Sequence, residues 1–471
     1  MRAHAVRRTV RLAGLALMGL TLLLALRIVA GKLLGPFVLA RAEREFQRDV
    51  GSLELADWFA PAPPSDQNLG MRLLEIGRRL PPDLRKQLKI VRDVPLGGES
   101  ENAIVGLQEV VARQQRLLDE LRTLPELPQS GAERIGGSAD TFTRSSGAYA
   151  NPDELLLPAQ ILAADARLAL HSGDRTRALA DLRALRWIAT ILRRDPGAFP
   201  WMLARPAEQH ALTVANILLQ RDGAAVAAGV SAELAALEAG GSDLRRMLAG
   251  EALLGRKMTR ERTLVPAAHE QDAPWADLFF PFTSAHLEAA SLSSSAFVAR
   301  ALEIPVPRWP RDWADPSLER SQLVGLICPW APFPVVEPTL QRLDFDGLRE
   351  AQRLASARRL GRIAAALAIE PPRTDATTPP PEPFAGAYAP LPWSDEPPQI
   401  ERQPDGSWTV SSPLGAELCR ERQPGEPDTP ATMRESRALL FRWEVPAPRV
   451  GNADPPLPVE GKTNPNLERQ R

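Results

Sequence analysis

The feature that most constrains this chain is an apolar run near its N-terminus, LAGLALMGLTLLLAL, from Leu12 to Leu26, without a charged residue. Four arginines precede it: Arg2, Arg7, Arg8 and Arg11. A basic flank before an apolar stretch directs a segment to the export machinery and keeps its N-terminus in the cytoplasm. The run's residues, at about 1.5 Å each, span roughly 22 Å, which is less than the ~30 Å hydrocarbon core of a bilayer.

The residues after the run distinguish a membrane anchor from a cleaved signal peptide. Apolar character resumes after Arg27 as IVAGKLLGPFVLA, without a convincing A-x-A cleavage site. The Arg27 side chain can reach the headgroups while Ile28 to Gly31 complete about twenty apolar residues. We therefore expect an uncleaved signal anchor, with a cleaved signal peptide as the alternative. The predicted localisation is the cell membrane, single-pass, with a cytoplasmic N-terminus and the bulk of the chain exported (periplasmic or extracellular).

The clearest folding signal lies at residues 155–197, LLLPAQILAADARLALHSGDRTRALADLRALRWIATILRRDPG. In its second half, apolar residues recur at three- and four-residue steps, at Ala178, Leu182, Leu185, Ala189 and Leu192. This spacing predicts one apolar stripe on a helix. The solvated face would carry Arg175, Asp181, Arg183, Arg193 and Arg194. The turn Ser172-Gly173-Asp174 predicts that the two halves pack as an antiparallel helical hairpin.

Further helices follow from the same periodicity. A third helix is predicted from Ala207 through Leu218, and others at about 37–50, 103–124, 231–238, 243–262, 286–302, 317–326 and 344–369.

QIERQPDGSWTVSS predicts a β-hairpin over residues 400–411, and ALLFRWEV a third strand over residues 438–445. Because three short strands cannot hold a core alone, we expect them to lean on the helical body.

The predicted fold class is mainly α: an N-terminal transmembrane helix, an irregular bundle of helical hairpins, a Pro-rich linker and a small C-terminal β appendix. Proline accounts for 46 of the 471 residues and is densest in the linker. The expected domains are a cytoplasmic tip and signal anchor (1–31), a stalk and first helical segment (32–124), a loop (125–152), a helical-hairpin body (153–369), the linker (370–398), a small β segment (399–445) and a disordered tail (446–471).

Two resemblances accompany these patterns. The 155–197 hairpin looks like a unit of the tetratricopeptide type, but no 34-residue repeat of it occurs elsewhere in the chain. The pieces ADWFAPAPPSDQN and LALHSGDRTRALADLRALRWIATILRRDPG, with the Ala/Arg/Leu-rich helix near residue 350, resemble a group of uncharacterised signal-anchored bacterial exported helical proteins. In that group the last helix leads into a segment similar to that of type II secretion pseudopilins. Here that segment is degenerate, and the resemblance implies no site residue and no function.

Composition and motifs exclude several classes of function. The 57 basic and 58 acidic residues give a net charge of -1, which does not predict a nucleic-acid binder. The five histidines are scattered, without H-E-x-x-H or Cys-x-x-Cys spacing, and no cofactor or metal is expected. The sequence contains no G-x-S-x-G elbow. Glu99-Ser100 and Gly106-Leu107-Gln108 echo lytic transglycosylases, but they are spaced too closely to build that active site, and Glu99 and Ser100 are interpreted as helix-start residues.

Two sets of residues remain as candidates. Cys328 and Cys419 are the two cysteines, so an oxidising exported compartment would allow one disulfide between them. The alternative is two buried thiols. Trp275, Trp309, Trp313 and Trp330 lie among prolines, where aromatic side chains either line a ligand or partner surface or fill the core beneath irregular loops.

From these observations we expect a membrane-anchored envelope protein that acts as a non-enzymatic helical scaffold or interaction protein. Its expected partners are the membrane, through the N-terminal helix, and other envelope proteins. The alternative is an exported enzyme that acts on cell-wall polymer, with its site near the Trp/Pro loops. Whether the chain is an enzyme is left open, with the absence of a coherent acid, base, nucleophile or metal set favouring the scaffold.

Overall fold

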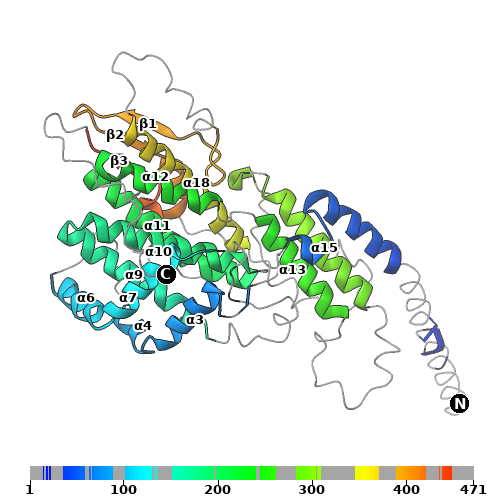
Figure 1. Ribbon diagram of the computed structural model, residues 1–471. Coiled ribbons are helices and arrows are strands. Elements are labelled where there is room, and N and C mark those ends of the chain that lie inside the picture. Colours follow the sequence, from blue (N-terminus) through cyan, green and yellow to red (C-terminus); the bar gives the residue numbers. More distant parts are fainter. Residues whose placement is uncertain are drawn as a thin grey trace, which may run out of the picture.

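The computed structural model describes residues 35–58, 63–88, 101–129, 151–195, 198–239, 244–260, 283–308, 345–370, 389–420 and 437–447, except positions 65 and 304, together with a few isolated residues. These residues are mainly helical and include a small three-stranded antiparallel sheet near the C-terminus (Figure 1). Within this part of the chain, no helix combines the length and apolar character needed to span a bilayer.

The predicted helical hairpin is confirmed as α9 (Asp153–Ser172) and α10 (Arg175–Arg194). Gly173 ends α9 with a φ of 79°, a left-handed conformation that glycine adopts without strain. The Asp174 side chain then caps α10 by accepting a hydrogen bond from the Arg177 backbone N–H at 3.0 Å. All five apolar positions of the predicted stripe are buried.

The main core consists of stacked helical layers (Figure 1). The hairpin packs on α11 (Ala198–Asp222), the predicted third helix, to form the middle layer. One side of it is covered by α3 (Leu69–Arg79), α4 (Leu84–Gln87), α6 (Glu101–Arg113), α7 (Gln115–Thr123) and η1 (Leu124–Glu126). The other side is covered by α12 (Ala224–Ala239) and α18 (Phe345–Ile369). The helices are therefore joined into one contiguous apolar cluster.

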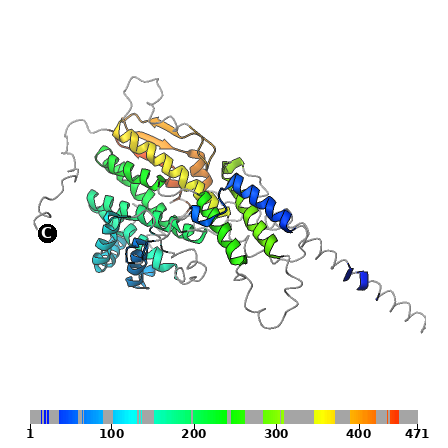
Figure 2. The same ribbon diagram turned by 45° about the vertical axis from the view of Figure 1, so that its right-hand side comes forward.

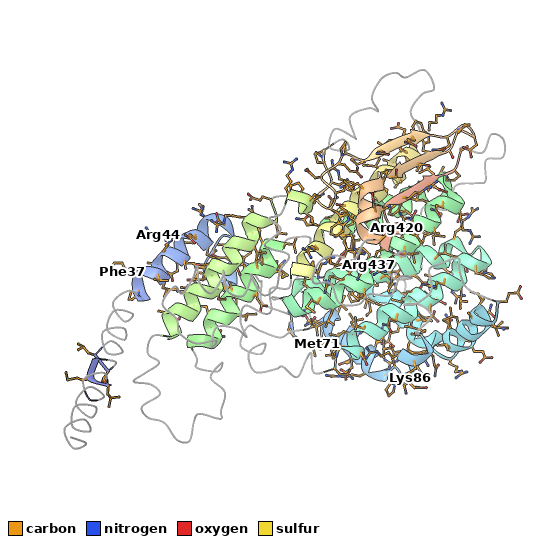
Figure 3. All side chains as sticks on the ribbon, turned by 180° about the vertical axis from the view of Figure 1, so that it is seen from behind. Phe37, Arg44, Met71, Lys86, Arg420 and Arg437 are labelled. Carbon is orange, nitrogen blue, oxygen red and sulfur yellow. The ribbon has the colours of Figure 1, made fainter. Side chains whose placement is uncertain are left out.

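A second, smaller core lies beside the main one (Figure 2). It is built by the helix of residues 35–49, α13 (Leu244–Arg260) and α15 (Thr283–Ala301), with α2 (Leu55–Trp58) against α13. Phe46 is fully buried in it, whereas Phe37, toward the N-terminal end of the same helix, is 73% exposed (Figure 3). Trp201, near the start of α11, and Ala351 of α18 also belong to this second core, so both helices link the two cores.

The sheet follows the predicted hairpin and leans on the helices as expected. β1 (Gln399–Arg402) pairs with β2 (Trp408–Ser411), and β2 pairs with β3 (Arg442–Val445), with Val410 opposite both Ile400 and Trp443. The Asn216 side chain of α11 donates hydrogen bonds to the Leu439 and Arg442 carbonyl oxygens, at 3.2 and 3.1 Å, and so attaches the third strand to the body.

The structure differs from the sequence-based expectations at three points near the C-terminus. The third strand begins at Arg442 rather than residue 438, because residues 437–439 are helical. A short helix that was not predicted, α19 (Pro413–Arg420), follows β2. The described end of the expected linker, residues 389–398, carries the buried side chains of Leu391 and Trp393, and this stretch therefore packs into the main core.

The expected solvated face of α10 is wrong for two of its five residues. Asp181 and Arg193 are buried, because α7, α9, α11 and α12 surround α10 on several sides rather than one. The helix expected at 317–326 lies outside the described residues, as does most of the apolar run from Leu12 to Leu26.

Candidate functional site

The candidate residues from the sequence fall mostly outside the described part of the chain. Trp275, Trp309, Trp313, Trp330 and Cys328 all lie there, and the proposed surface and disulfide remain predictions. Cys419 lies in α19, where its buried thiol is hydrogen-bonded to the Arg353 guanidinium of α18. Burial lowers the pKa of Arg353 to about 9, and the neighbouring thiol partly opposes this shift.

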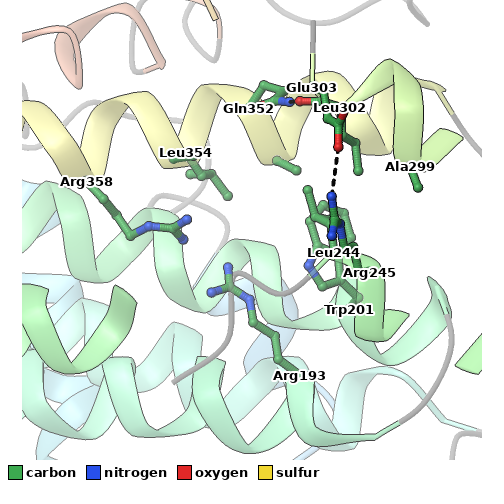
Figure 4. Close-up of a pocket in the computed structure, with 12 residues that line it drawn as sticks. Arg193, Trp201, Leu244, Arg245, Ala299, Leu302, Glu303, Gln352, Leu354 and Arg358 are labelled. Carbon is green, nitrogen blue, oxygen red and sulfur yellow. Dashed lines mark hydrogen bonds and ion pairs between the residues drawn. The ribbon is translucent and has the colours of Figure 1, made fainter. Parts of the chain in front are cut away.

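A cleft of about 340 Å³ lies where the two cores meet (Figure 4). Its walls come from α10, α11, α13, α15 and α18. At one end, Arg193 and Arg358 point toward one another. At the other end lie Trp201, Leu244 and Leu302, beside an ion pair between Arg245 and Glu303. The cleft thus combines an apolar end with a strongly basic end.

Helix geometry explains how the two arginines reach the cleft. Arg193 lies four residues after Ala189, which places it beside the buried stripe of α10 rather than opposite to it. Arg358 lies four residues after the buried Leu354, on the same face of α18. The four-residue spacing of Arg193 from the stripe therefore indicated in the sequence that this side chain could be buried. The approach of α18 to α10 at the cleft had no such signal.

Glu208 of α11 lies behind both arginines and forms an ion pair with each of them. All three side chains are buried, with exposed fractions of 3% for Arg193, 6% for Arg358 and 0% for Glu208. Burial lowers the pKa of Arg358 to about 10 and that of Arg193 well below its ordinary value, the latter with a further contribution from the nearby Arg358 charge. One carboxylate therefore compensates two buried guanidinium groups.

The hydrogen bonding of Arg193 is incomplete. In the described structure its Nε and Nη1 atoms are buried and have no hydrogen-bond acceptor. By contrast, Arg245 at the rim donates to Glu303 at 2.8 Å, and both side chains are exposed. The Gln352 amide donates to the Leu302 carbonyl oxygen at 3.1 Å and so links two walls of the cleft. Among the described residues, these hydrogen-bond donors without an acceptor thus lie at the basic end of the cleft.

A second buried ionic cluster lies between α7, α9 and α10. Arg122 donates from Nε to Asp181 at 2.7 Å and also pairs with Asp165, and Arg177 donates from Nε to Asp165 at 2.9 Å. Both carboxylates are fully buried. Burial raises the pKa of Asp181 to about 7, against the opposing effect of the Arg122 charge. Because its members join three helices, this cluster has a structural role.

His210 of α11 is the histidine whose environment is most informative. It is partly buried, and burial together with the Arg167 charge lowers its pKa to about 4, so it is neutral at pH 7. Among the described residues, no group of three or more His, Cys, Asp and Glu side chains is arranged to hold a metal ion.

Comparison with known proteins adds no family to this description. No protein-family model, curated protein or solved structure matches the chain. The resemblance to signal-anchored exported proteins therefore remains a prediction, and the arguments below rest on the chain's own residues.

Proposed function

We propose that this chain is a membrane-anchored bacterial envelope protein, whose exported helical body serves as a non-enzymatic scaffold or interaction surface for other envelope proteins. The observation that carries the anchor is the exposure of the apolar N-terminal side chains. Leu17, Met18 and Leu22 are 62–66% exposed, among the most exposed large apolar residues of the described chain. A run of such residues needs an apolar environment outside the protein, and the acyl chains of a lipid bilayer provide one.

The charge pattern sets the orientation of this anchor. The arginines before the apolar run are retained on the cytoplasmic side, and no comparable cluster of basic residues follows the run directly. The body from about residue 32 onward is then exported.

The helix of residues 35–49 supports a scaffold rather than a loosely tethered domain. Its Ala42, Phe46 and Val50 side is buried in the second core, where Val50 directly follows the helix. Glu43 pairs with Arg256 of α13, and Asp49 pairs with Arg300 of α15 at 3.5 Å. The described helix nearest to the proposed anchor is therefore packed into the folded body, which supports a body held close to the bilayer.

The anchor is tested by the double substitution Leu17→Arg with Leu22→Arg in the full chain. We expect the variant to be lost from the carbonate-washed membrane fraction, because two charges at the centre of a span make insertion unfavourable. Val105→Arg, at a 53% exposed apolar position of the body, is the matched control and should leave the protein in the membrane. A reporter fused after residue 471 should be active in an exported compartment; activity in the cytoplasm would contradict the orientation.

The interaction role is tested by affinity purification of the anchored protein from its native envelope. A stoichiometric membrane or envelope partner is the expected result. Release of fragments from purified cell-wall polymer by the full chain would instead support the alternative enzymatic function.

A further inference from the structure

Among the residues that the structure describes, the charge at the basic end of the cleft is not fully balanced. Arg193 and Arg358 carry two positive charges and Glu208 carries one negative charge, which leaves a net charge of +1 in a buried position. The rim adds nothing to this sum, because Arg245 and Glu303 neutralise one another. An uncompensated buried charge is unfavourable, and protein structures keep such charges by pairing them.

The donors of Arg193 that lack an acceptor also require a negatively charged or hydrogen-bond-accepting partner. Two nitrogen atoms of Arg193, Nε and Nη1, are buried without an acceptor in the described structure. Arg353 has two similar unpaired atoms, but it pairs with Glu350 and does not line this cleft. Arg193, in the described part of the chain, combines unused donors, excess charge and an adjoining cavity.

We propose that the cleft binds a small amphipathic monocarboxylate, a molecule with one carboxylate group and a short apolar tail. The carboxylate lies against Arg193 and Arg358, and the tail lies between Trp201, Leu244 and Leu302. A single negative charge neutralises the net +1, whereas a doubly charged phosphate would leave an excess of negative charge. A guanidinium group also presents its donors in a planar fork that matches the two oxygen atoms of a carboxylate.

The dimensions and lining of the cleft fit this class of ligand. Its volume of about 340 Å³ is at the lower end of the range of small-molecule sites, which runs from about 300 to 1,000 Å³. Trp201, Leu244 and Leu302 provide apolar lining at the end away from Arg193 and Arg358. Because the walls belong to both cores, the bound ligand stabilises the contact between them and raises the melting temperature.

Calorimetric titration of the full chain in lipid nanodiscs, with empty nanodiscs as the reference, tests the proposal. Hexanoate is the probe; hexanol tests the need for the charge, and inorganic phosphate tests the need for a carboxylate with an apolar tail. We expect hexanoate to bind at one site per chain, and hexanol and phosphate to bind at least tenfold more weakly.

Variants then locate the site. Arg193→Gln leaves the Glu208–Arg358 pair intact and removes the excess charge, so we expect at least a tenfold loss of hexanoate affinity. Glu208→Gln removes the competing carboxylate and is expected to increase the affinity. Ala355→Leu fills part of the cleft without changing any charge and should also weaken binding at least tenfold. Arg183→Gln is the matched control, because Arg183 lies on α10 but is half-exposed and pairs with Glu126 and Glu233.

Three outcomes would overturn the proposal: no hexanoate binding to the full chain, binding that is unchanged in both Arg193→Gln and Ala355→Leu, or tighter binding of phosphate than of hexanoate. If circular dichroism shows that Arg193→Gln does not fold, Ala355→Leu decides, because it keeps every charge of the site.

Discussion

The indole ring of Trp443 in β3 lies directly over Gly361 of α18, so close that a Cβ atom at position 361 would lie 2.5 Å from its Cη2 atom. Trp443 is fully buried, and its Nε1 donates to the Leu440 carbonyl oxygen at 2.8 Å. The sheet therefore attaches to the helical body through an aromatic ring that requires a glycine on the opposing helix.

Gly361→Ala should destabilise the protein by about 1–3 kcal/mol, because the added methyl group meets a buried ring that cannot move freely. Chemical denaturation of the wild type and the variant measures this change. Gly106→Ala is the control: it also lies within a helix, α6, but its Cβ would meet nothing within 4 Å. It should gain up to about 1 kcal/mol from helix propensity. Equal effects of the two substitutions would contradict the assigned contact.

Leu182→Ala or Leu185→Ala should each lower the free energy of unfolding by about 2–5 kcal/mol, because both side chains are buried in the main core. Leu439→Ala, at a position that is 48% exposed, should change it far less. Thermal melting of the three variants provides the comparison. If both core substitutions melt like the wild type, the stripe of α10 does not face the core.

Asp181 should make stability decrease as pH rises. Its pKa in the folded chain is about 7, against an ordinary value of 3.8, so between these values the folded state holds a proton that the unfolded state releases. Its contribution is fully present below about pH 4 and is lost as pH rises through 7, with a slope of up to about 1.4 kcal/mol per pH unit. Asp181→Asn should remove this contribution in urea unfolding between pH 4 and 7, so that the stability of the variant rises with pH over this range. Asp66→Asn, at an exposed carboxylate, should leave it in place.

His210 should make stability increase as pH rises, over nearly the same pH range in which Asp181 makes it decrease. Its folded pKa of about 4 lies below the ordinary 6.5, so the unfolded chain takes up a proton that the folded chain does not. Stability is therefore lost as pH falls from about 6.5 toward 4. Urea unfolding of His210→Gln should reveal the uncompensated effect of Asp181, whereas His171→Gln, at an exposed position of α9, should resemble the wild type. If neither Asp181→Asn nor His210→Gln changes the pH dependence of the wild-type stability, both assignments are contradicted.

Cys328 and Cys419 either form one disulfide in the exported protein or remain two separate thiols, and in the described structure Cys419 carries a buried thiol. Closing a loop of about ninety residues would stabilise the fold by about 4 to 5 kcal/mol in the chain-entropy estimate, and less if the bond geometry is strained. A thiol count under denaturing, non-reducing conditions distinguishes the two alternatives, because the disulfide would leave no reactive thiol. Detection of two reactive thiols would show that the cysteines are unpaired, with Cys419 remaining beside Arg353.

The sequence predicted those parts of the fold that depend on neighbouring residues. The α9–α10 hairpin followed from a repeat of apolar residues and a Gly-Asp turn, and both signals act within one or two helical turns. The β1–β2 hairpin likewise followed from a Pro-Asp-Gly turn between short strands. Even here, the third strand is shorter than predicted, and its attachment to the body uses the contact of Asn216 with the chain at Leu439 and Arg442.

The arginine-lined cleft could not be predicted in this way. Periodicity in α10 separates one face from another, but it does not show how many helices will surround that helix, so Asp181 and Arg193 were expected on the solvated side. Arg358 meets Glu208 across 150 positions of the chain, and only the packing of α18 on α11 brings them together. Local hydrogen bonding and side-chain spacing thus determined the helices from the sequence, whereas long-range packing decided which charges are buried and where a cavity lies.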